Sequence, residues 1–178
     1  LTFVVAGAGF TGVEMIGELA IWVRSLCKEY DIDRKDVRLV IVDMLPRILN
    51  NLKEENSIKA HRYLEKKLKV EVMLNTRITG ANEKGLTYEG GEIEAGTVIW
   101  SAGIKAADSA DELELERVNR SKRIKVDEFC RTQYENVYCV GDLGGLSGEN
   151  GMPFAAMVEN AIQTAHGAAE NILNDIRG

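Results

Sequence analysis

LTFVVAGAGFTGVEMIGEL, residues 1–19, is the stretch that decides the fold. It opens with LTFVVA (1–6), an apolar run rich in β-branched residues, which predicts a short buried strand. From Phe10 onward apolar residues recur three or four positions apart, which predicts a helix that ends near Tyr30. Glycines stand between the two in the pattern G-x-G-x-x-G. This order of strand, glycine turn and helix is typical of the first unit of a dinucleotide-binding α/β domain.

Each glycine of the pattern has its own physical role. Gly7 permits the tight turn, Gly9 lets a pyrophosphate approach the backbone, and Gly12 lets helix and strand pack closely. The start of the helix adds free N–H groups and the positive end of the helix dipole. We therefore predict that the loop, including Phe10 and Thr11, binds the phosphates of a dinucleotide. A purely structural glycine turn is the alternative.

A carboxylate follows the second predicted strand, VRLVIVD, and is Asp43. At that place it can accept hydrogen bonds from both hydroxyls of an adenosine ribose, and it would repel a 2′-phosphate. This favours NADH over NADPH as the coenzyme. Arg47 nearby acts in the other direction, because an arginine can accommodate a 2′-phosphate. An ordinary solvated aspartate at a strand end is the alternative.

The rest of the first hundred residues continues the α/β pattern, with turn signals such as NEKG and GG separating short alternating segments. The expected elements are strands at 37–43, 70–74 and 97–103, a helix within 51–69, and short antiparallel strands at 78–82, 85–89 and 92–94. This order predicts a Rossmann-like domain over residues 1–103, with a parallel sheet, helices and a β-meander crossover.

Residues 104–178 form a second region of different character. RIKVD (123–127) and NVYCVGD (136–142) predict strands, and an amphipathic segment predicts a helix over 153–173. The region has no glycine loop of the kind that follows the first strand. We therefore expect an incomplete domain.

Three further features bear on a site. Glu14 is expected in the first turn of the first helix, where a carboxylate gains from the helix dipole. A structural role and a contact with the reacting ring of a coenzyme both stay open for it. Ala102 and Gly103 end the strand at 97–103 and leave backbone that a flat ligand can approach. Trp22 and Trp100 are expected in the core.

Composition excludes several classes of protein. A net charge of -6 over 178 residues argues against a nucleic-acid-binding surface. No run reaches the roughly 18 apolar residues of a membrane-spanning helix. Cys27, Cys130 and Cys139 are far apart in the sequence, which indicates neither a C-x-x-C redox pair nor a metal site and favours a reducing, intracellular setting.

Four segments together resemble the two-dinucleotide flavoprotein oxidoreductases, also known as the pyridine nucleotide-disulfide oxidoreductase family. They are FVVAGAGFTGVEMIGELA, VRLVIVDMLPRIL, TVIWSAGIKA and NVYCVGDLGG, and they occur in the family's order. GAGFTGVE and VIWSAGIKA are most similar to type II NADH dehydrogenases, single-chain enzymes that pass electrons from NADH through FAD to quinone without pumping protons. The resemblance covers nearly all of the chain.

The resemblance implies a role for each region. Residues 1–103 would be the NADH domain, inserted in an FAD domain whose later part is 104–178. Gly141 and Asp142 in VYCVGD would then contact flavin ribityl or pyrophosphate oxygens.

The acceptor side is also implied by resemblance. Glu159 and Gln163 take the places of a glutamine pair that family members carry near the quinone. The glutamate departs from that pattern.

The resemblance also implies what this sequence leaves out. The family's own FAD-gripping glycine loop and its C-terminal membrane-contacting segment have no counterpart here. We expect a fragment that binds NADH but does not hold FAD by itself, belonging to a cytoplasmic enzyme that lies at the inner face of the cell membrane. The expected partner is a quinone-type acceptor, with the membrane surface reached through the missing segments. The sequence is compatible with a homodimer, and no nucleic acid is expected.

Three alternatives stay open at this point. The parent enzyme could be a ferredoxin or rubredoxin reductase or an NADH oxidase of the same superfamily. The chain could instead be a catalytically silent NAD-binding sensor module. An S-adenosylmethionine-dependent methyltransferase also has a glycine loop and a following acid, but it leaves VYCVGD and the short antiparallel strands unexplained.

Overall fold

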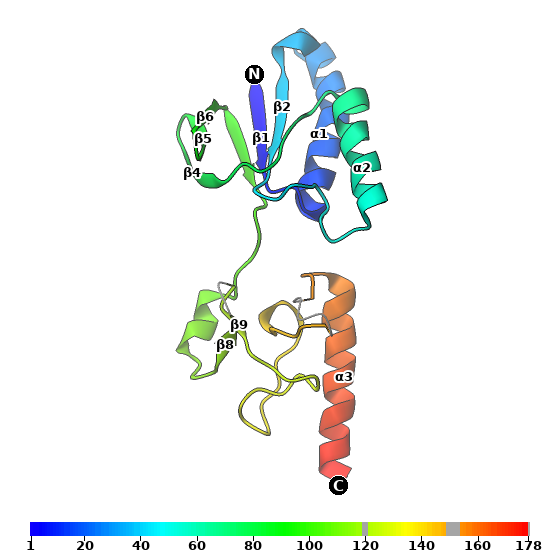
Figure 1. Ribbon diagram of the computed structural model, residues 1–178, viewed down its shortest axis with the longest axis vertical. Helices are drawn as coiled ribbons and strands as arrows, with labels where there is room; N and C mark the ends of the chain where they lie inside the picture. The colour runs from blue at the N-terminus through cyan, green and yellow to red at the C-terminus, as the bar shows by residue number, and fades with distance from the viewer. Residues whose placement is uncertain (119–120, 149–153, 178) are drawn as a thin grey trace. The chain divides into compact units, whose positions relative to one another are not determined.

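A computed structural model describes residues 1–118, 121–148 and 154–177. The chain divides into two compact units, unit 1 (Leu1–Gly103) and unit 2 (Ile104–Gly178) (Figure 1).

Unit 1 is built on a four-stranded parallel sheet with the strand order β3-β2-β1-β7. The strands are β1 (Thr2–Ala6), β2 (Arg38–Val42), β3 (Glu71–Met73) and β7 (Thr97–Trp100). Ala6 at the end of β1 lies opposite Val42 on one side and Trp100 on the other, so the carboxyl ends of these strands are level. A parallel sheet with covering helices confirms the predicted α/β class.

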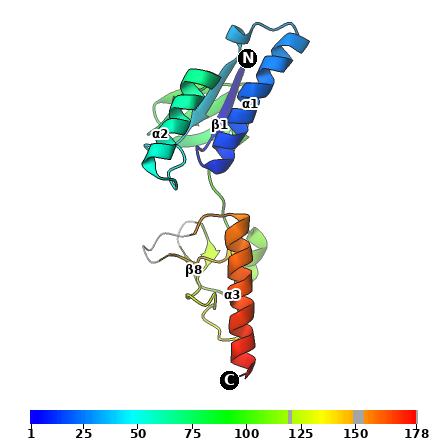
Figure 2. The same ribbon diagram turned by 90° about the vertical axis from the view of Figure 1, so that its right-hand side faces the viewer.

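Two helices cover one face of this sheet, α1 (Phe10–Glu29) and α2 (Glu54–Tyr63), and α2 continues as a π-helical turn, η2 (Leu64–Leu68) (Figure 2). The stripe that predicted the first helix is buried in α1 at Ile16, Ala20, Val23 and Cys27. It packs against side chains of β1 and β2 in the larger hydrophobic cluster. The burial of this stripe positions the start of α1 directly after β1.

A three-stranded antiparallel meander covers the other face of the sheet. It consists of β4 (Ile78–Asn82), β5 (Gly85–Tyr88) and β6 (Gly91–Glu94), each within a residue or two of its predicted bounds. Leu86 and Ile93 of the meander pack against Val4, Val40 and Val42 of the sheet in a second hydrophobic cluster. Because successive strand residues point to opposite faces, β1 and β2 contribute to both clusters.

The described part of unit 2 has little regular structure apart from one long helix. Its elements are the 3₁₀ turn η3 (Asp108–Glu112), the short strands β8 (Arg117–Val118) and β9 (Arg123–Ile124), the 3₁₀ turn η4 (Gly141–Leu143) and helix α3 (Val158–Arg177). β8 and β9 form a two-stranded antiparallel sheet.

Two predictions of strands in unit 2 are wrong. The strand expected at 123–127 is reduced to β9, and 136–142 is not a strand. A strand needs neighbours that satisfy its N–H and C=O groups. Among the described residues, 136–142 makes a single β-bridge, from Tyr138 to Arg131. Apolar composition alone therefore predicted more strand pairing than this segment forms.

The predicted start of the last helix is also wrong. Pro153 lies outside the described residues, and Phe154–Met157 are not helical. The Phe154 N–H donates to the carbonyl of Leu146 at 3.1 Å, and its carbonyl accepts from the Arg123 guanidinium at 3.1 Å. These bonds hold its backbone outside the helix, and α3 starts at Val158.

Both tryptophans lie outside the core, contrary to expectation. Trp22 is 62 % exposed because the buried stripe of α1 runs through Ala20 and Val23 and leaves it on the outer side. Trp100 is 55 % exposed at the last residue of the edge strand β7.

Candidate functional site

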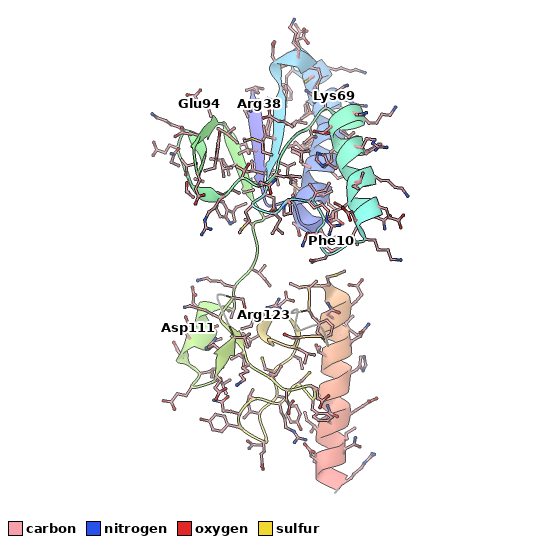
Figure 3. The ribbon with its side chains drawn as sticks, viewed as in Figure 1. Phe10, Arg38, Lys69, Glu94, Asp111 and Arg123 are labelled. Carbon is pink, nitrogen blue, oxygen red and sulfur yellow. The ribbon has the colours of Figure 1, made fainter. Side chains whose placement is uncertain are left out.

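Three chain segments meet at the carboxyl-end edge of the unit 1 sheet. They are the glycine loop (Gly7–Gly12) after β1, the segment that starts at Asp43 after β2, and Ser101–Gly103 after β7. In Figure 3 Phe10 marks this edge, and Arg38 at the start of β2 marks the opposite one. Ligands of open parallel sheets bind outside the carboxyl ends of the strands, where the strand order reverses, as it does here between β1 and β7.

The three glycines of the loop differ in what surrounds them. Gly7 has φ +99°, and a Cβ there would lie 2.7 Å from the carbonyl oxygen of Ser101. A Cβ on Gly12 would lie 1.9 Å from the carbonyl oxygen of Gly7. Both positions therefore exclude a side chain for reasons of packing. A Cβ on Gly9 would meet nothing within 4 Å, so this glycine borders space that a ligand can occupy.

The N-terminus of α1 opens at this loop without a side-chain cap. Gly9 is its N-cap residue, its carbonyl accepts from the Val13 N–H at 3.0 Å, and no described side chain caps this end. The first N–H groups of a helix have no partner within the helix. Together with the helix dipole they make an anion-binding position beside Gly9.

Glu14 does not sit in the first turn, contrary to expectation. Because α1 starts at Phe10, its first turn ends at Val13 and contains no acidic residue. Glu14 is exposed in the next turn. The effect of the dipole falls off within one turn, so its gain from the helix end is small.

Asp43 makes two short contacts with backbone N–H groups. One carboxylate oxygen, Oδ2, accepts from the Ala8 N–H at 2.6 Å, and Oδ1 accepts from the Leu45 N–H at 2.8 Å. Asp43 therefore ties the glycine loop to the end of β2. Each oxygen can accept a second hydrogen bond, and the residue is only half-buried. It keeps the capacity to bind ligand hydroxyls.

Ser101 is a residue that the sequence analysis missed. Its hydroxyl lies 2.9 Å from the carbonyl of Ala6 and 3.2 Å from that of Gly7, so it joins the end of β7 to the glycine loop. The only sequence signal was a small polar residue directly after an apolar strand. Ala102 and Gly103 follow it and are exposed, and Gly103 has φ +97°.

The remaining candidates lie in unit 2. Gly141 has φ +62° and donates its N–H to the Thr164 hydroxyl of α3 at 3.0 Å. The neighbouring Asp142 is exposed. Glu159 and Gln163 are both exposed on α3, four positions apart and therefore on one face of the helix.

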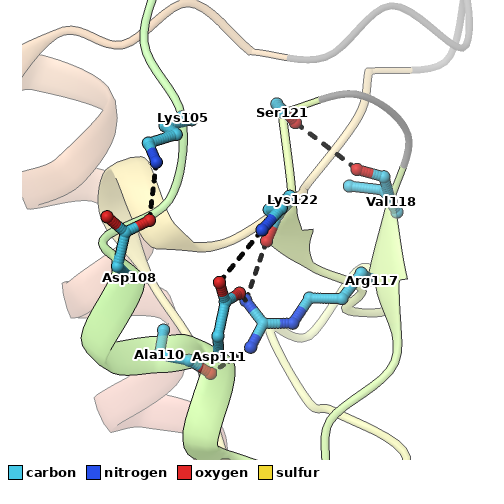
Figure 4. A network of polar contacts seen from close by, with 8 residues as sticks. All are labelled: Lys105, Asp108, Ala110, Asp111, Arg117, Val118, Ser121 and Lys122. Carbon is cyan, nitrogen blue, oxygen red and sulfur yellow. Dashed lines mark hydrogen bonds and ion pairs between the residues drawn. The ribbon is translucent and has the colours of Figure 1, made fainter.

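Unit 2 also contains a network of charged side chains. Lys105 pairs with Asp108 at 2.6 Å, and Asp111 pairs with Lys122 at 3.0 Å and with Arg117 at 3.8 Å (Figure 4). The hydrogen bond from Lys105 lowers the pKa of the Asp108 carboxyl. Both members of that pair are exposed, and the network contains none of the candidate site residues.

No helix in the described part of the chain is both long enough and apolar enough to cross a membrane.

Comparison with protein families gives one match that covers most of the chain. The sequence profile of the pyridine nucleotide-disulphide oxidoreductases matches residues 1–171.

Curated relatives match the chain along its whole length. The type II NADH:quinone oxidoreductase of Staphylococcus saprophyticus is 32 % identical over all of this chain and 45 % of its own length. The enzyme of the same name from Staphylococcus aureus is 33 % identical over the same shares. The chain thus spans 45 % of the length of these relatives.

Solved structures share the fold. The NAD-dependent persulfide reductase of A. fulgidus is 26 % identical, with a TM-score of 0.69 over 96 % of this chain and 30 % of its own. A pyridine nucleotide-disulfide family oxidoreductase of Enterococcus faecalis superimposes with a TM-score of 0.74 over 96 % of this chain and 38 % of its own; at 23 % identity it shows the fold alone.

Proposed function

The chain belongs to the pyridine nucleotide-disulphide oxidoreductase family, and on that premise we propose that it forms the NADH-binding part of an FAD-dependent enzyme that passes electrons from NADH to a quinone-type acceptor. The names of its curated relatives, type II NADH:quinone oxidoreductases at 32 and 33 % identity, support this choice.

One arrangement in unit 1 carries the proposal. The open space beside Gly9, the uncapped start of α1 and the carboxylate of Asp43 adjoin one another at the carboxyl-end edge of the sheet. A diphosphate needs N–H donors without a side chain in the way, and a ribose needs an acceptor for its hydroxyls. The residues present fit both needs.

The proposed roles follow from these positions. The N–H groups of Gly9 to Gly12 hold the diphosphate, and Asp43 accepts from the ribose hydroxyls. Ala102 and Gly103 flank the nicotinamide end, because β7 ends beside the glycine loop and offers exposed backbone there. Glu14 remains our candidate for orienting that ring.

When bound, NADH would supply a hydride and FAD would accept it. The chain's own residues hold and orient the coenzyme and exclude water, and none of them has to transfer a proton. Catalysis by this part of the enzyme is therefore a matter of position.

For unit 2 we propose a contribution to a flavin site. Gly141 adopts a left-handed backbone conformation, and Asp142 beside it presents an exposed carboxylate. We propose that Asp142 contacts flavin oxygens and that Glu159 and Gln163 face the acceptor, with the rest of the FAD site supplied by polypeptide outside this chain. The enzyme would be cytoplasmic and peripheral to the membrane, where quinones are dissolved.

The test is a titration of the purified chain with NADH, NADPH and S-adenosylmethionine, followed by coenzyme fluorescence and calorimetry. We expect micromolar binding of NADH and none of the other two. Gly9→Val should remove NADH binding while the far-UV circular dichroism and the unfolding midpoint stay unchanged, since its side chain enters open space. Normal binding by that variant would contradict the site.

A second measurement addresses the flavin. The purified chain should show no flavin absorbance. A stoichiometric flavin spectrum would contradict the proposed division of the FAD site.

A further inference from the structure

Two of the three cysteines lie directly opposite one another in unit 2. Arg131 and Tyr138 form an antiparallel β-bridge. On one side of it the Thr132 N–H donates to the carbonyl of Val137 at 2.9 Å, and on the other the Cys139 N–H donates to the carbonyl of Cys130 at 2.9 Å. Cys130 and Cys139 share this backbone hydrogen bond, and the Cα atoms of a hydrogen-bonded antiparallel pair are about 5.5 Å apart. That spacing lies within the range of about 4.4–6.8 Å that disulfides require.

The backbone around this pair is held in place by α3. Arg131 donates to both carboxylate oxygens of Asp175 at 2.7 Å, and the Tyr138 hydroxyl donates to the same carboxylate. The bridge that sets Cys130 opposite Cys139 is therefore fixed to the helix at both of its residues.

The two thiols share a buried environment. Cys130 is 4 % exposed and Cys139 is 8 % exposed. Burial raises the pKa of both thiols; the Asp127 carboxylate adds to this at Cys130, and the neighbouring Cys130 adds to it at Cys139.

The backbone at Cys130 would suit glycine better than cysteine. The Cys130 N–H donates to the Asp127 carbonyl at 3.1 Å, and the Asp127 N–H donates to the Arg131 carbonyl at 2.9 Å. These bonds close a turn followed by a bulge, and Cys130 at the bulge has φ +66°. Such a position favours glycine or asparagine. A cysteine there bears a backbone cost that a glycine would not bear.

We propose that Cys130 and Cys139 are a redox-sensitive thiol pair that forms a reversible disulfide with a small-molecule disulfide as oxidant. The thiolate of one cysteine attacks the oxidant, giving a mixed disulfide and releasing one small thiol. The second thiolate then attacks the protein sulfur of that mixed disulfide and releases the other small thiol. In total two cysteine thiols and one disulfide become one protein disulfide and two small thiols, so the oxidant is reduced by two electrons.

The test uses the whole chain and oxidised glutathione at about pH 8.5, where these thiols ionise more readily than at neutral pH. Free thiols are then alkylated under denaturing conditions and the protein is digested with trypsin. Cleavage after Lys125 and Arg131 separates Cys130, in VDEFCR, from Cys139, in the peptide 132–177. A disulfide joins these two peptides in the mass spectrum, and dithiothreitol separates them.

Cys27 provides the matched control, because it is also buried but lies on α1 in unit 1. We expect the Cys130–Cys139 link to exceed any link to Cys27 by at least about tenfold, since the opposite position gives a high effective concentration. Cys27→Ser should leave the link intact. In urea the preference should disappear.

Two results would overturn the proposal. One is oxidation that stops at glutathione adducts on single cysteines in the folded chain. The other is a link to Cys27 as abundant as the link between Cys130 and Cys139. Cys130→Gly gives an independent check, because it should abolish the link while the far-UV circular dichroism spectrum stays unchanged, since glycine adopts the positive φ of this position without strain. If that variant unfolds, Cys139→Ser replaces it.

Discussion

Unit 1 and unit 2 differ in how they bury apolar side chains. Unit 1 has a hydrophobic cluster on each face of its sheet, with β-branched residues of β1 and β2 in both. In the described part of unit 2 the buried apolar residues are few and mostly small: Ala106, Ala110, Ile124, Cys130, Cys139 and Ala168. Hydrophobic stabilisation scales with buried apolar area, so unit 1 carries most of it.

The long helix of unit 2 makes the difference visible. Ala168 on its inner side is buried, whereas Val158, Ile162 and Ile176 are 71, 53 and 76 % exposed. The inner side is held by hydrogen bonds, such as that from Gly141 to Thr164. The comparison teaches that a helix can form along its full length while much of its apolar surface stays exposed among the described residues.

The largest expected effect comes from separating the two units. As isolated peptides, residues 1–103 should unfold in urea in one sharp transition with a free energy of about 5 kcal/mol, because both clusters lie within them. Residues 104–178 should show a broad change with no sharp transition. Urea titrations followed by circular dichroism test this, and a cooperative transition in the second peptide would remove the contrast.

The next effect concerns Gly12. Gly12→Ala should destabilise unit 1 by more than about 3 kcal/mol, because the added carbon meets the Gly7 carbonyl, which is backbone and cannot move aside. Gly17→Ala is the matched control on the same helix. Its added carbon meets nothing within 4 Å, so it should stabilise by about 1 kcal/mol. Equal unfolding midpoints for the two variants would show that α1 and β1 are packed less closely than described.

Replacing Asp43 should have two smaller effects, one on NADH binding and one on the stability of unit 1. Asp43→Ala is expected to weaken NADH binding by about 1.5–3 kcal/mol, as for lost hydrogen bonds to a charged group. It should also destabilise unit 1 by about 1–2 kcal/mol, because the Ala8 and Leu45 N–H groups lose their acceptor. Calorimetry and urea unfolding measure the two. Asp33→Ala is the control: it removes an exposed carboxylate that accepts from the Lys35 N–H and should leave the dissociation constant for NADH unchanged. If Asp43→Ala also left this dissociation constant unchanged, Asp43 would be excluded from the site.

The smallest effect is expected in the charge network of unit 2. The lowered pKa of Asp108 means that its pair with Lys105 stabilises at neutral pH and that this contribution is lost as the pH falls through that pKa. Both side chains are exposed, so water screens the interaction. Asp108→Asn should therefore cause no measurable change in thermal unfolding at pH 7. A clear fall in the thermal unfolding midpoint of Asp108→Asn would show that polar contacts compensate for the small core of unit 2.

The difference in apolar burial between unit 1 and unit 2 also explains which elements could be predicted from the sequence. In unit 1 the strands and α1 agreed with their predicted bounds to within a few residues, because apolar periodicity there corresponds to real burial on both faces of a sheet. In unit 2 the apolar segment 136–142 predicted a strand that lacks the neighbours to form one. The start of α3 was predicted too early because long-range bonds to Phe154 have no sequence signature.

The candidate site was predictable in position but not in its internal bonds. Glycine spacing and a strand-end acid located the loop and Asp43. That Asp43 also accepts from the Ala8 N–H, and that Ser101 joins β7 to the loop, depends on strand order and register, which the sequence pattern does not contain.

The hydrogen bond between Ala8 and Asp43 has a consequence for coenzyme preference. It gives the glycine loop its shape before any coenzyme arrives, so little conformational entropy is lost on binding and more of the contact energy is kept as affinity. Position 43 therefore anchors the loop, and under the proposed function it is also the group that discriminates between the two forms of the coenzyme. Replacing Asp43 by a neutral residue, in order to favour NADPH, would also remove the acceptor of the Ala8 N–H and leave the glycine loop less ordered. Such a variant would need a second substitution that supplies another acceptor for this N–H.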